Sequence, residues 1–210
     1  MPPEISKQLL SDRVYDLIRA AILDGSRPPG SRVVESEIAR SLSISQAPVR
    51  DAVRRLAHAG LVTSEPRRGS HVTELSEEDF GIARQLRAAL EGIGARAAVE
   101  HLTPGDLAEL REIVALMGQA VAAGEWAEFR CLDMRFHHRV MVIADGAVLG
   151  RVWDTLEPLL ISQHAISDPA FSGDRSKLVQ WHGDLIAALE AGDPEVAGAA
   201  FHAHASGALS

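Results

Sequence analysis

A carboxylate and three imidazoles in the second half of the sequence have the types and spacing of a metal site. Asp133 and His137 are four residues apart in a segment with helical periodicity, which puts both on one helix face about one turn apart. His182 and His204 are 22 residues apart in two further amphipathic segments. If these segments form an antiparallel helix pair, the four side chains can converge on a first-row divalent metal. Spacing alone leaves open the alternative of separate polar surface residues.

A second chemical signal is the arginine content of the first third of the chain. Residues 27–73 contain eight arginines but only four acidic residues. Gln46 and Arg50 stand near the start of a segment with helical periodicity, and Arg54 is one turn further on. Arginine can pair bidentately with guanine, and glutamine with adenine. These side chains therefore have the chemistry to contact the base edges and phosphates of DNA.

Three helices and a hairpin are expected to position these side chains. Apolar periodicity predicts helices over about residues 9–24, 35–42 and 45–59. Ser45 is a favourable N-cap for the third helix. The apolar residues of that helix would face the core of the domain; they are Val49, Val53 and Leu56.

The predicted hairpin adds two more cations. Short apolar stretches at 61–63 and 70–73 flank a turn that carries Arg67 and Arg68 at its tip, followed by Gly69. In a winged helix-turn-helix the recognition helix enters the major groove, and the wing can contact the backbone or the minor groove. An isolated arginine is usually a solvated surface residue. The order of three helices and a hairpin nevertheless favours DNA binding by the whole set.

The strand signals stop beyond residue 76. Six amphipathic segments follow, over about residues 77–100, 104–123, 125–144, 147–165, 174–191 and 193–208. Glycines and prolines separate them, which predicts an all-helical domain. The fold class is therefore mainly α, with a winged helix-turn-helix domain over 1–75 and an all-α bundle over 76–210. His164 is a candidate for lining a ligand cavity in the bundle.

Charge divides at the same boundary. The chain of 210 residues has a net charge of −8, which by itself disfavours nucleic acid, but residues 1–75 carry +2 and residues 76–210 carry −10. Its 46% hydrophobic and 24% charged residues are typical of a globular protein. The single Cys131, the absence of a signal-peptide pattern at the start and the lack of a membrane-length apolar run predict a cytoplasmic protein with no membrane partner.

Four stretches of the first domain follow a family pattern: Glu35-Ser36-Glu37-Ile38-Ala39, the segment from Ser45 to Leu56, Gly60-Leu61-Val62, and Arg68-Gly69-Ser70-His71-Val72. In them, residues 32–73 resemble the DNA-binding domain of GntR-type transcriptional regulators. The sequence departs from the family at Gln46 and Ala47, where Arg and Thr are usual, so we expect a different operator half-site. The resemblance implies that a homodimer binds a palindromic double-stranded operator. The DNA-binding residues it indicates are Ser36, Ser45, Gln46, Ala47, Arg50, Arg54, Arg67, Arg68 and Gly69.

The second domain carries further motifs: Leu86-Arg87-Ala88-Ala89-Leu90-Glu91, Leu132 to His137, and His182 followed by Ile186 to Asp193 and by His204. In these, residues 76–210 resemble the FCD domain of the FadR subfamily, in its shorter six-helix form. The resemblance implies that Asp133, His137, His182 and His204 bind a divalent transition metal, with zinc favoured over nickel, manganese, cobalt or iron. It also implies that Arg87 pairs with the carboxylate of an effector. The alternative for Arg87 is a structural ion pair with Glu91.

These features together predict a ligand-responsive transcriptional regulator. We expect a repressor controlled by a small organic acid that binds next to the metal. One alternative is a metal-sensing regulator, in which the metal is the signal. A metalloenzyme is disfavoured, because no motif supplies a base or a nucleophile and a DNA-binding domain serves no purpose in turnover.

Overall fold

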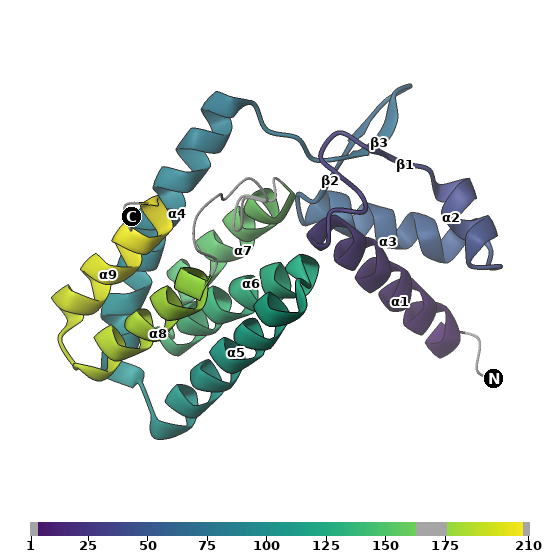
Figure 1. The fold of residues 1–210 in the computed structure, drawn as a ribbon. Helices are drawn as coiled ribbons and strands as arrows, with labels where there is room; N and C mark the ends of the chain where they lie inside the picture. The colour runs from purple at the N-terminus through teal and green to yellow at the C-terminus, as the bar shows by residue number, and fades with distance from the viewer. Residues whose placement is uncertain (1–3, 163–175, 208–210) are drawn as a thin grey trace.

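Residues 4–162 and 176–207 are described by a computed structural model (Figure 1). The N-terminal part contains α1 (Glu4–Leu23), β1 (Arg32–Val33), α2 (Glu35–Ser41), α3 (Gln46–His58), β2 (Val62–Glu65) and β3 (Gly69–Val72). The C-terminal part contains α4 (Glu77–His101), α5 (Pro104–Ala123), α6 (Trp126–Ile143), α7 (Ala147–Ser162), α8 (Ser176–Glu190) and α9 (Pro194–Ser206). The winged helix-turn-helix and the all-α bundle are therefore both confirmed.

The N-terminal part is built on α1 and α3, which pack against each other and against a small antiparallel sheet. The strand order is β1-β3-β2, with Thr63 of β2 opposite His71 of β3. The two-residue strand β1 was not predicted from the sequence. Apolar side chains of α1 and α3 are at most 3% exposed, as expected for the core of the domain: Val14, Ile18, Ile22, Val49, Val53 and Leu56.

The predicted cap of α3 needs a correction. Ser45 occupies the N-cap position with an extended backbone, as expected, but its side chain makes no capping hydrogen bond. The hydroxyl is exposed at the start of the recognition helix. A hydrogen-bonding group in that position is open to a partner outside the chain.

In the C-terminal part, α4 and α9 are packed side by side (Figure 1). Gly92 of α4 permits this close approach, because a Cβ added there would lie only 3.1 Å from the backbone oxygen of Gly198 on α9. An exposed pair between Arg96 and Glu195 joins the same two helices. The packing brings His204 on α9 next to the residues that α4 buries.

Helices α5, α6 and α8 complete the bundle core around large apolar side chains. Leu110 of α5, Phe129 and Phe136 of α6, and Phe201 of α9 are at most 1% exposed. A capping box between Thr103 and Asp106 begins α5, and Gly124 in the left-handed conformation ends it. None of the helices in the described part of the chain is long and apolar enough to cross a membrane. The proposed cavity residue His164 lies outside the described residues.

The two parts of the chain touch through α1. Nε and Nη2 of Arg130 on α6 donate to the backbone oxygens of Leu23 (3.1 Å) and Asp24 (2.7 Å), at the end of α1. Gly60, which follows α3, lies against Pro158 of α7. The winged domain is thus attached to the bundle by contacts as well as by the chain that leads into α4.

Candidate metal centre and nucleic-acid interface

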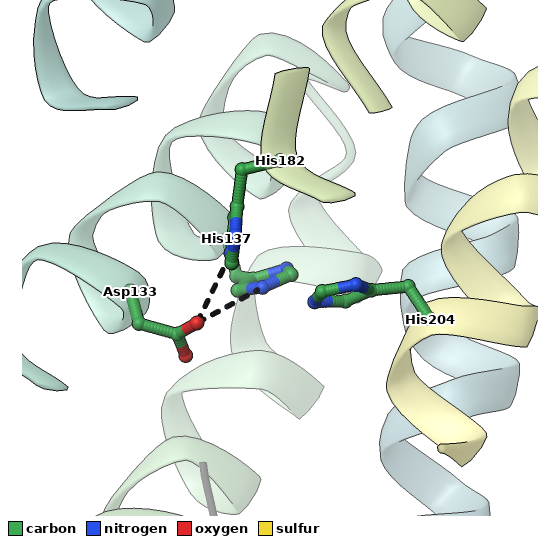
Figure 2. A group of neighbouring side chains, drawn as sticks. All are labelled: Asp133, His137, His182 and His204. Atoms are coloured by element: carbon green, nitrogen blue, oxygen red, sulfur yellow. Dashed lines mark ion pairs between the residues drawn. The ribbon is translucent and has the colours of Figure 1, made fainter. Parts of the chain in front are cut away.

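The four predicted metal ligands come together in the bundle, although they come from three helices. Asp133 and His137 are on α6, His182 is on α8 and His204 is on α9, and their side chains point toward one another in Figure 2. One ligand atom from each residue lies within 4.8 Å of the other three. Oδ1 of Asp133 is 3.0 Å from Nε2 of His182 and 3.9 Å from Nε2 of His137. Ligands bound ~2.1 Å from one ion would be separated by about 3–4 Å.

The hydrogen bonding around these atoms also fits a metal. Within the described residues, five buried atoms of the cluster have no hydrogen-bond partner: Oδ2 of Asp133, Nδ1 and Nε2 of His137, Nε2 of His182 and Nδ1 of His204. Buried polar atoms are normally satisfied. The Nδ1 atom of His182 is satisfied, because it lies 2.7 Å from the backbone oxygen of Leu178. That contact places the ring proton on Nδ1 and leaves Nε2 with a free lone pair for a ligand.

Electrostatics favour the ligand forms of these residues. Burial, reinforced by the His137 and His182 rings, lowers the pKa of His204 to about 3. Burial alone would raise the pKa of Asp133, but the contact with His182, the nearby His137 ring and the Arg87 guanidinium lower it. At neutral pH the cluster therefore offers a neutral imidazole at His204 and a carboxylate at Asp133, and metals bind these forms.

Aromatic rings form an apolar shell around the cluster. Phe136 contacts His182 edge-on, with ring centroids 5.0 Å apart, and Phe201 packs against His137 at 6.3 Å. His137 and His204 stack at 5.1 Å. A shell of this kind fixes the rings and keeps water out, which strengthens the interaction of an ion with its ligands.

Arg87 is also at this centre, where sequence reasoning placed it, and it is only 6% exposed. Its Nε donates to Oε1 of Glu91, and its Nη2 lies 4.0 Å from Oδ2 of Asp133. The ion pair with Glu91 is thus present in the structure. Glu91 itself, which was considered only as a partner for Arg87, also reaches His137, with Oε2 2.7 Å from Nδ1.

The predicted DNA-contacting side chains all lie on the exposed surface of the winged domain. Those from helix α3 and its N-cap are exposed at its N-terminal and outward positions: Ser45, Gln46, Ala47, Arg50 and Arg54. Ser36 is exposed on α2, Arg67 and Arg68 are exposed in the turn between β2 and β3, and Gly69 is exposed at the start of β3. Arg67 and Gly69 both have positive φ angles, +68° and +88°, so the tip of the wing is a tight turn.

Acidic residues hold several of these arginines in the absence of DNA. Nε of Arg50 pairs with Glu35 of α2 at 3.3 Å, and the Arg50 side chain remains 67% exposed. Arg54 pairs with Asp51 at 3.2 Å, and Arg68 pairs with Glu65 at 3.1 Å. Exposed pairs of this kind contribute little to stability, so a phosphate or a base can displace them.

A recognition helix and a wing that are both exposed and cationic define a DNA-binding transcription regulator. Comparison with known families gives the same result: residues 10–72 match the gntR family of bacterial regulatory proteins, and residues 83–207 match the FCD domain. The chain belongs to the GntR family of transcription regulators. The relatives that it matches are regulators, not enzymes.

Individual relatives agree over nearly the whole chain. The "Probable D-xylose utilization operon transcriptional repressor" of Paenarthrobacter nicotinovorans is 34% identical over 98% of this chain and 89% of its own length. The repressor RspR of Escherichia coli K12 is 27% identical over 94% of this chain and 86% of its own length. The solved structure of E. coli McbR/YncC has the same fold, with a TM-score of 0.82 at 23% identity, and covers 95% of each chain.

Proposed function

We propose that this protein is a repressor whose affinity for a palindromic operator is controlled by a small organic acid. Residues 1–75 bind the DNA, and residues 76–210 bind the metal, the acid and a second copy of the chain, in the cytoplasm where the DNA lies. The observation that carries the proposal is the buried cluster of Asp133, His137, His182 and His204 beside Arg87. The repressor names of two relatives support the sign of regulation.

The metal is proposed to be a divalent transition ion held by Asp133, His137, His182 and His204. Three imidazoles and one carboxylate suit zinc first, then nickel, manganese, cobalt or iron. Such an ion would supply a Lewis-acid position for an anionic oxygen. We propose that the ion binds the effector and is not itself the signal. The buried cation of Arg87 next to the cluster supports this choice.

The acid is proposed because a guanidinium is the preferred partner of a carboxylate. Arg87 uses its Nε for Glu91, while its Nη2 faces Asp133 without reaching it closely. An effector carboxylate that pairs with the remaining N–H groups of Arg87 would lie next to the proposed metal. This neighbourhood selects small anions over neutral ligands.

A homodimer is proposed because a palindromic operator needs two recognition helices related by two-fold symmetry. The outer face of α4 offers a surface for a second copy. Ile82, Leu86 and Ile93 fall on one side of this helix and are 49%, 56% and 54% exposed. An apolar stripe of this size on a bundle helix is a common element of a dimer interface.

Regulation requires that the acid bind one arrangement of the domains better than the other. A coupling free energy of ~1–3 kcal/mol would change operator affinity ~5–150-fold. The acid and the operator then weaken or strengthen each other's binding by the same factor.

A thermal-shift screen of small carboxylates against zinc-loaded protein tests this proposal. We expect a carboxylate that raises Tm in the wild type and has no effect on Arg87→Ala. D-xylose belongs in the same screen because of the name of one relative. A response to D-xylose alone, or a carboxylate response that survives in Arg87→Ala, would contradict the proposed ligand class. A change in operator affinity on zinc addition alone would favour the metal-sensing regulator.

A further inference from the structure

A buried carboxylate stands between Arg87 and the proposed metal ligands without being one of them. The side chain of Glu91 is 0% exposed. Its two oxygens have different partners: Oε1 accepts from Nε of Arg87, and Oε2 lies 2.7 Å from Nδ1 of His137. A buried charge without partners is strongly unfavourable, and the contacts with Arg87 and His137 supply these partners.

We propose that Glu91 is a positioning residue of the metal centre, which holds the His137 ring so that Nε2 faces the ion. The inference rests on the proposed metal site. A ligating histidine usually donates its second ring N–H to a carboxylate or a carbonyl, which fixes the tautomer and makes the ligand more basic. His182 has this arrangement with the carbonyl of Leu178. For His137 the corresponding group is the Glu91 carboxylate, whose Oε2 lies 2.7 Å from Nδ1 as an ion-pair contact without the angles of a hydrogen bond.

The geometry distinguishes this role from simple neutralisation of Arg87. Arginine and carboxylate often form a two-pronged pair in which both oxygens contact the guanidinium. Glu91 gives only one oxygen to Arg87 and turns the other toward His137. The same side chain therefore links the residue proposed to bind the acid to a residue proposed to bind the metal. An acid that draws Arg87 away from Glu91 would therefore alter the contact between Glu91 and His137.

Cobalt(II) is a suitable probe, because its affinity can be measured against a chromophoric chelator and its absorption spectrum reports the ligand field. We compare wild type with Glu91→Gln and with Arg87→Met/Glu91→Met, in which the buried ion pair is replaced by apolar side chains of similar length. Glu91→Gln keeps an acceptor for Nδ1. We expect a ~10–100-fold loss of cobalt affinity and a changed spectrum in the double variant, and a smaller loss in Glu91→Gln.

The outcomes separate the two roles. If Glu91 only neutralises Arg87, the double variant binds cobalt as tightly as wild type with an unchanged spectrum, and the inference is overturned. The control is Glu195→Gln, an exposed carboxylate on the helix of His204, which should leave both readouts unchanged. A wild type that binds no cobalt would instead remove the proposed metal site itself. Circular dichroism of each variant checks that the bundle has formed.

A different contact leads to a second inference, about communication between the domains. Arg130 hydrogen-bonds the last carbonyls of α1 and lies three residues before Asp133 on the same helix. The end of a helix carries unpaired carbonyls and partial negative charge, so a guanidinium there is a favourable clamp. On its other side α1 packs against α3, where its buried Ile18 and Ile22 share one core with Val53.

We infer that the hydrogen bonds of Arg130 to the end of α1 transmit a change at the metal cluster to the recognition helix α3. Helix α6 carries the proposed ligands Asp133 and His137. It contacts α1, which packs against the recognition helix α3. Arg130 and Asp133 are three residues apart on one continuous helix, so a shift of the α6 backbone at Asp133 would also displace Arg130. This inference rests on the proposed control of operator affinity by the bundle. It names the Arg130 hydrogen bonds as the contact through which that control acts.

Amide hydrogen exchange of the full chain, with EDTA and then with zinc, tests this role of Arg130. We expect zinc to change exchange in α1 and α3 of the wild type, and in Arg130→Gln to change it only within the bundle. Arg135→Gln is the matched control, because Arg135 is on the same helix but faces Glu109 within the bundle. The inference is overturned if the zinc-dependent change in α1 exchange persists in Arg130→Gln, or if it is absent in wild type that binds zinc. A wild type that binds no zinc fails at the proposed metal site instead.

Discussion

The winged domain and the helical bundle both present several charged side chains, but they hold them in opposite ways. On the DNA-binding surface, Arg50 and Arg68 are largely exposed and make single pairs with neighbouring acids. In the bundle, Arg87, Glu91 and His137 are buried, and each contacts another member of the network. Water screens the first set, while the second set is removed from water.

This difference teaches how each region should respond to change. Exposed contacts act almost independently, so their effects on DNA binding should add. Buried polar groups in one network leave each other unsatisfied when one is lost, so their effects should be larger and should not add.

The largest effect is expected for Asp133→Ala. The change removes the only carboxylate among the proposed ligands and leaves three imidazoles without their anion. Substitution of a residue that only supports a metal ligand typically lowers metal affinity by ~10–100-fold. Removal of a ligand itself should therefore lower zinc affinity by more than ~100-fold. Elemental analysis after zinc loading should find little metal. The control is Asp184→Ala, an exposed carboxylate on the helix of His182; full occupancy in Asp133→Ala would exclude the residue as a ligand.

The next effect is expected for Arg50→Ala on the DNA-binding surface. Loss of a bidentate base contact costs about 1–3 kcal/mol, or ~5–150-fold in affinity, for each half-site, and relaxes the base preference at that position. The fold should not change, because Arg50 is exposed and its pair with Glu35 is weak. Fluorescence anisotropy with operator variants measures this, with Arg111→Ala of the bundle as control. Unchanged affinity and footprint would remove Arg50 from the interface.

A smaller effect is expected for Arg67→Ala and Arg68→Ala in the wing. These cations are assigned to phosphates or the minor groove, so each change should weaken binding to all sequences similarly. If each contacts one phosphate in a half-site, the slope of log K against log salt should decrease by about 1 for each half-site. The double variant should show the sum of the two effects. A sequence-dependent loss or a clearly non-additive double variant would contradict the view of independent exposed contacts.

The mildest effect is a pH dependence of the metal-free protein. The pKa of His204 is held at about 3 in the fold, against an ordinary value of 6.5. Between these values the unfolded chain takes up a proton that the folded chain does not, so the free energy of unfolding falls as pH decreases below 6.5. Urea denaturation at pH 7 and pH 5 should show a loss of at most about 2 kcal/mol from this residue. His204→Gln should lack that part of the loss; an equal loss in both proteins would contradict the assignment.

Local patterns predicted most of the fold. The helix periods, the turn around Arg67 and the glycine and proline boundaries are properties of short segments, so they are visible without tertiary structure. The strand β1 was missed because two residues carry no period, and its pairing with β3 depends on a distant partner. The early start of α1 was also missed, since the first residues lack a clear apolar repeat.

The sites were predicted unevenly for the same reason. The i, i+4 spacing of Asp133 and His137 and the family pattern indicated the ligands. The contact of Glu91 with His137 joins α4 to α6, and that of Arg130 with Leu23 joins the two domains. Such contacts depend on how helices pack, which spacing along one helix does not reveal. The pair between Arg50 and Glu35 was missed likewise, because it bridges α2 and α3.

We propose that a carboxylate bound in the bundle controls the affinity of the winged domain for DNA. The most direct measurement is the operator affinity of zinc-loaded protein, with and without a carboxylate that binds it, in wild type and in Arg87→Ala. We predict a ~5–150-fold change in the wild type, in line with ordinary allosteric coupling, and no change in Arg87→Ala. An operator affinity that stays the same in wild type saturated with the acid would contradict the account.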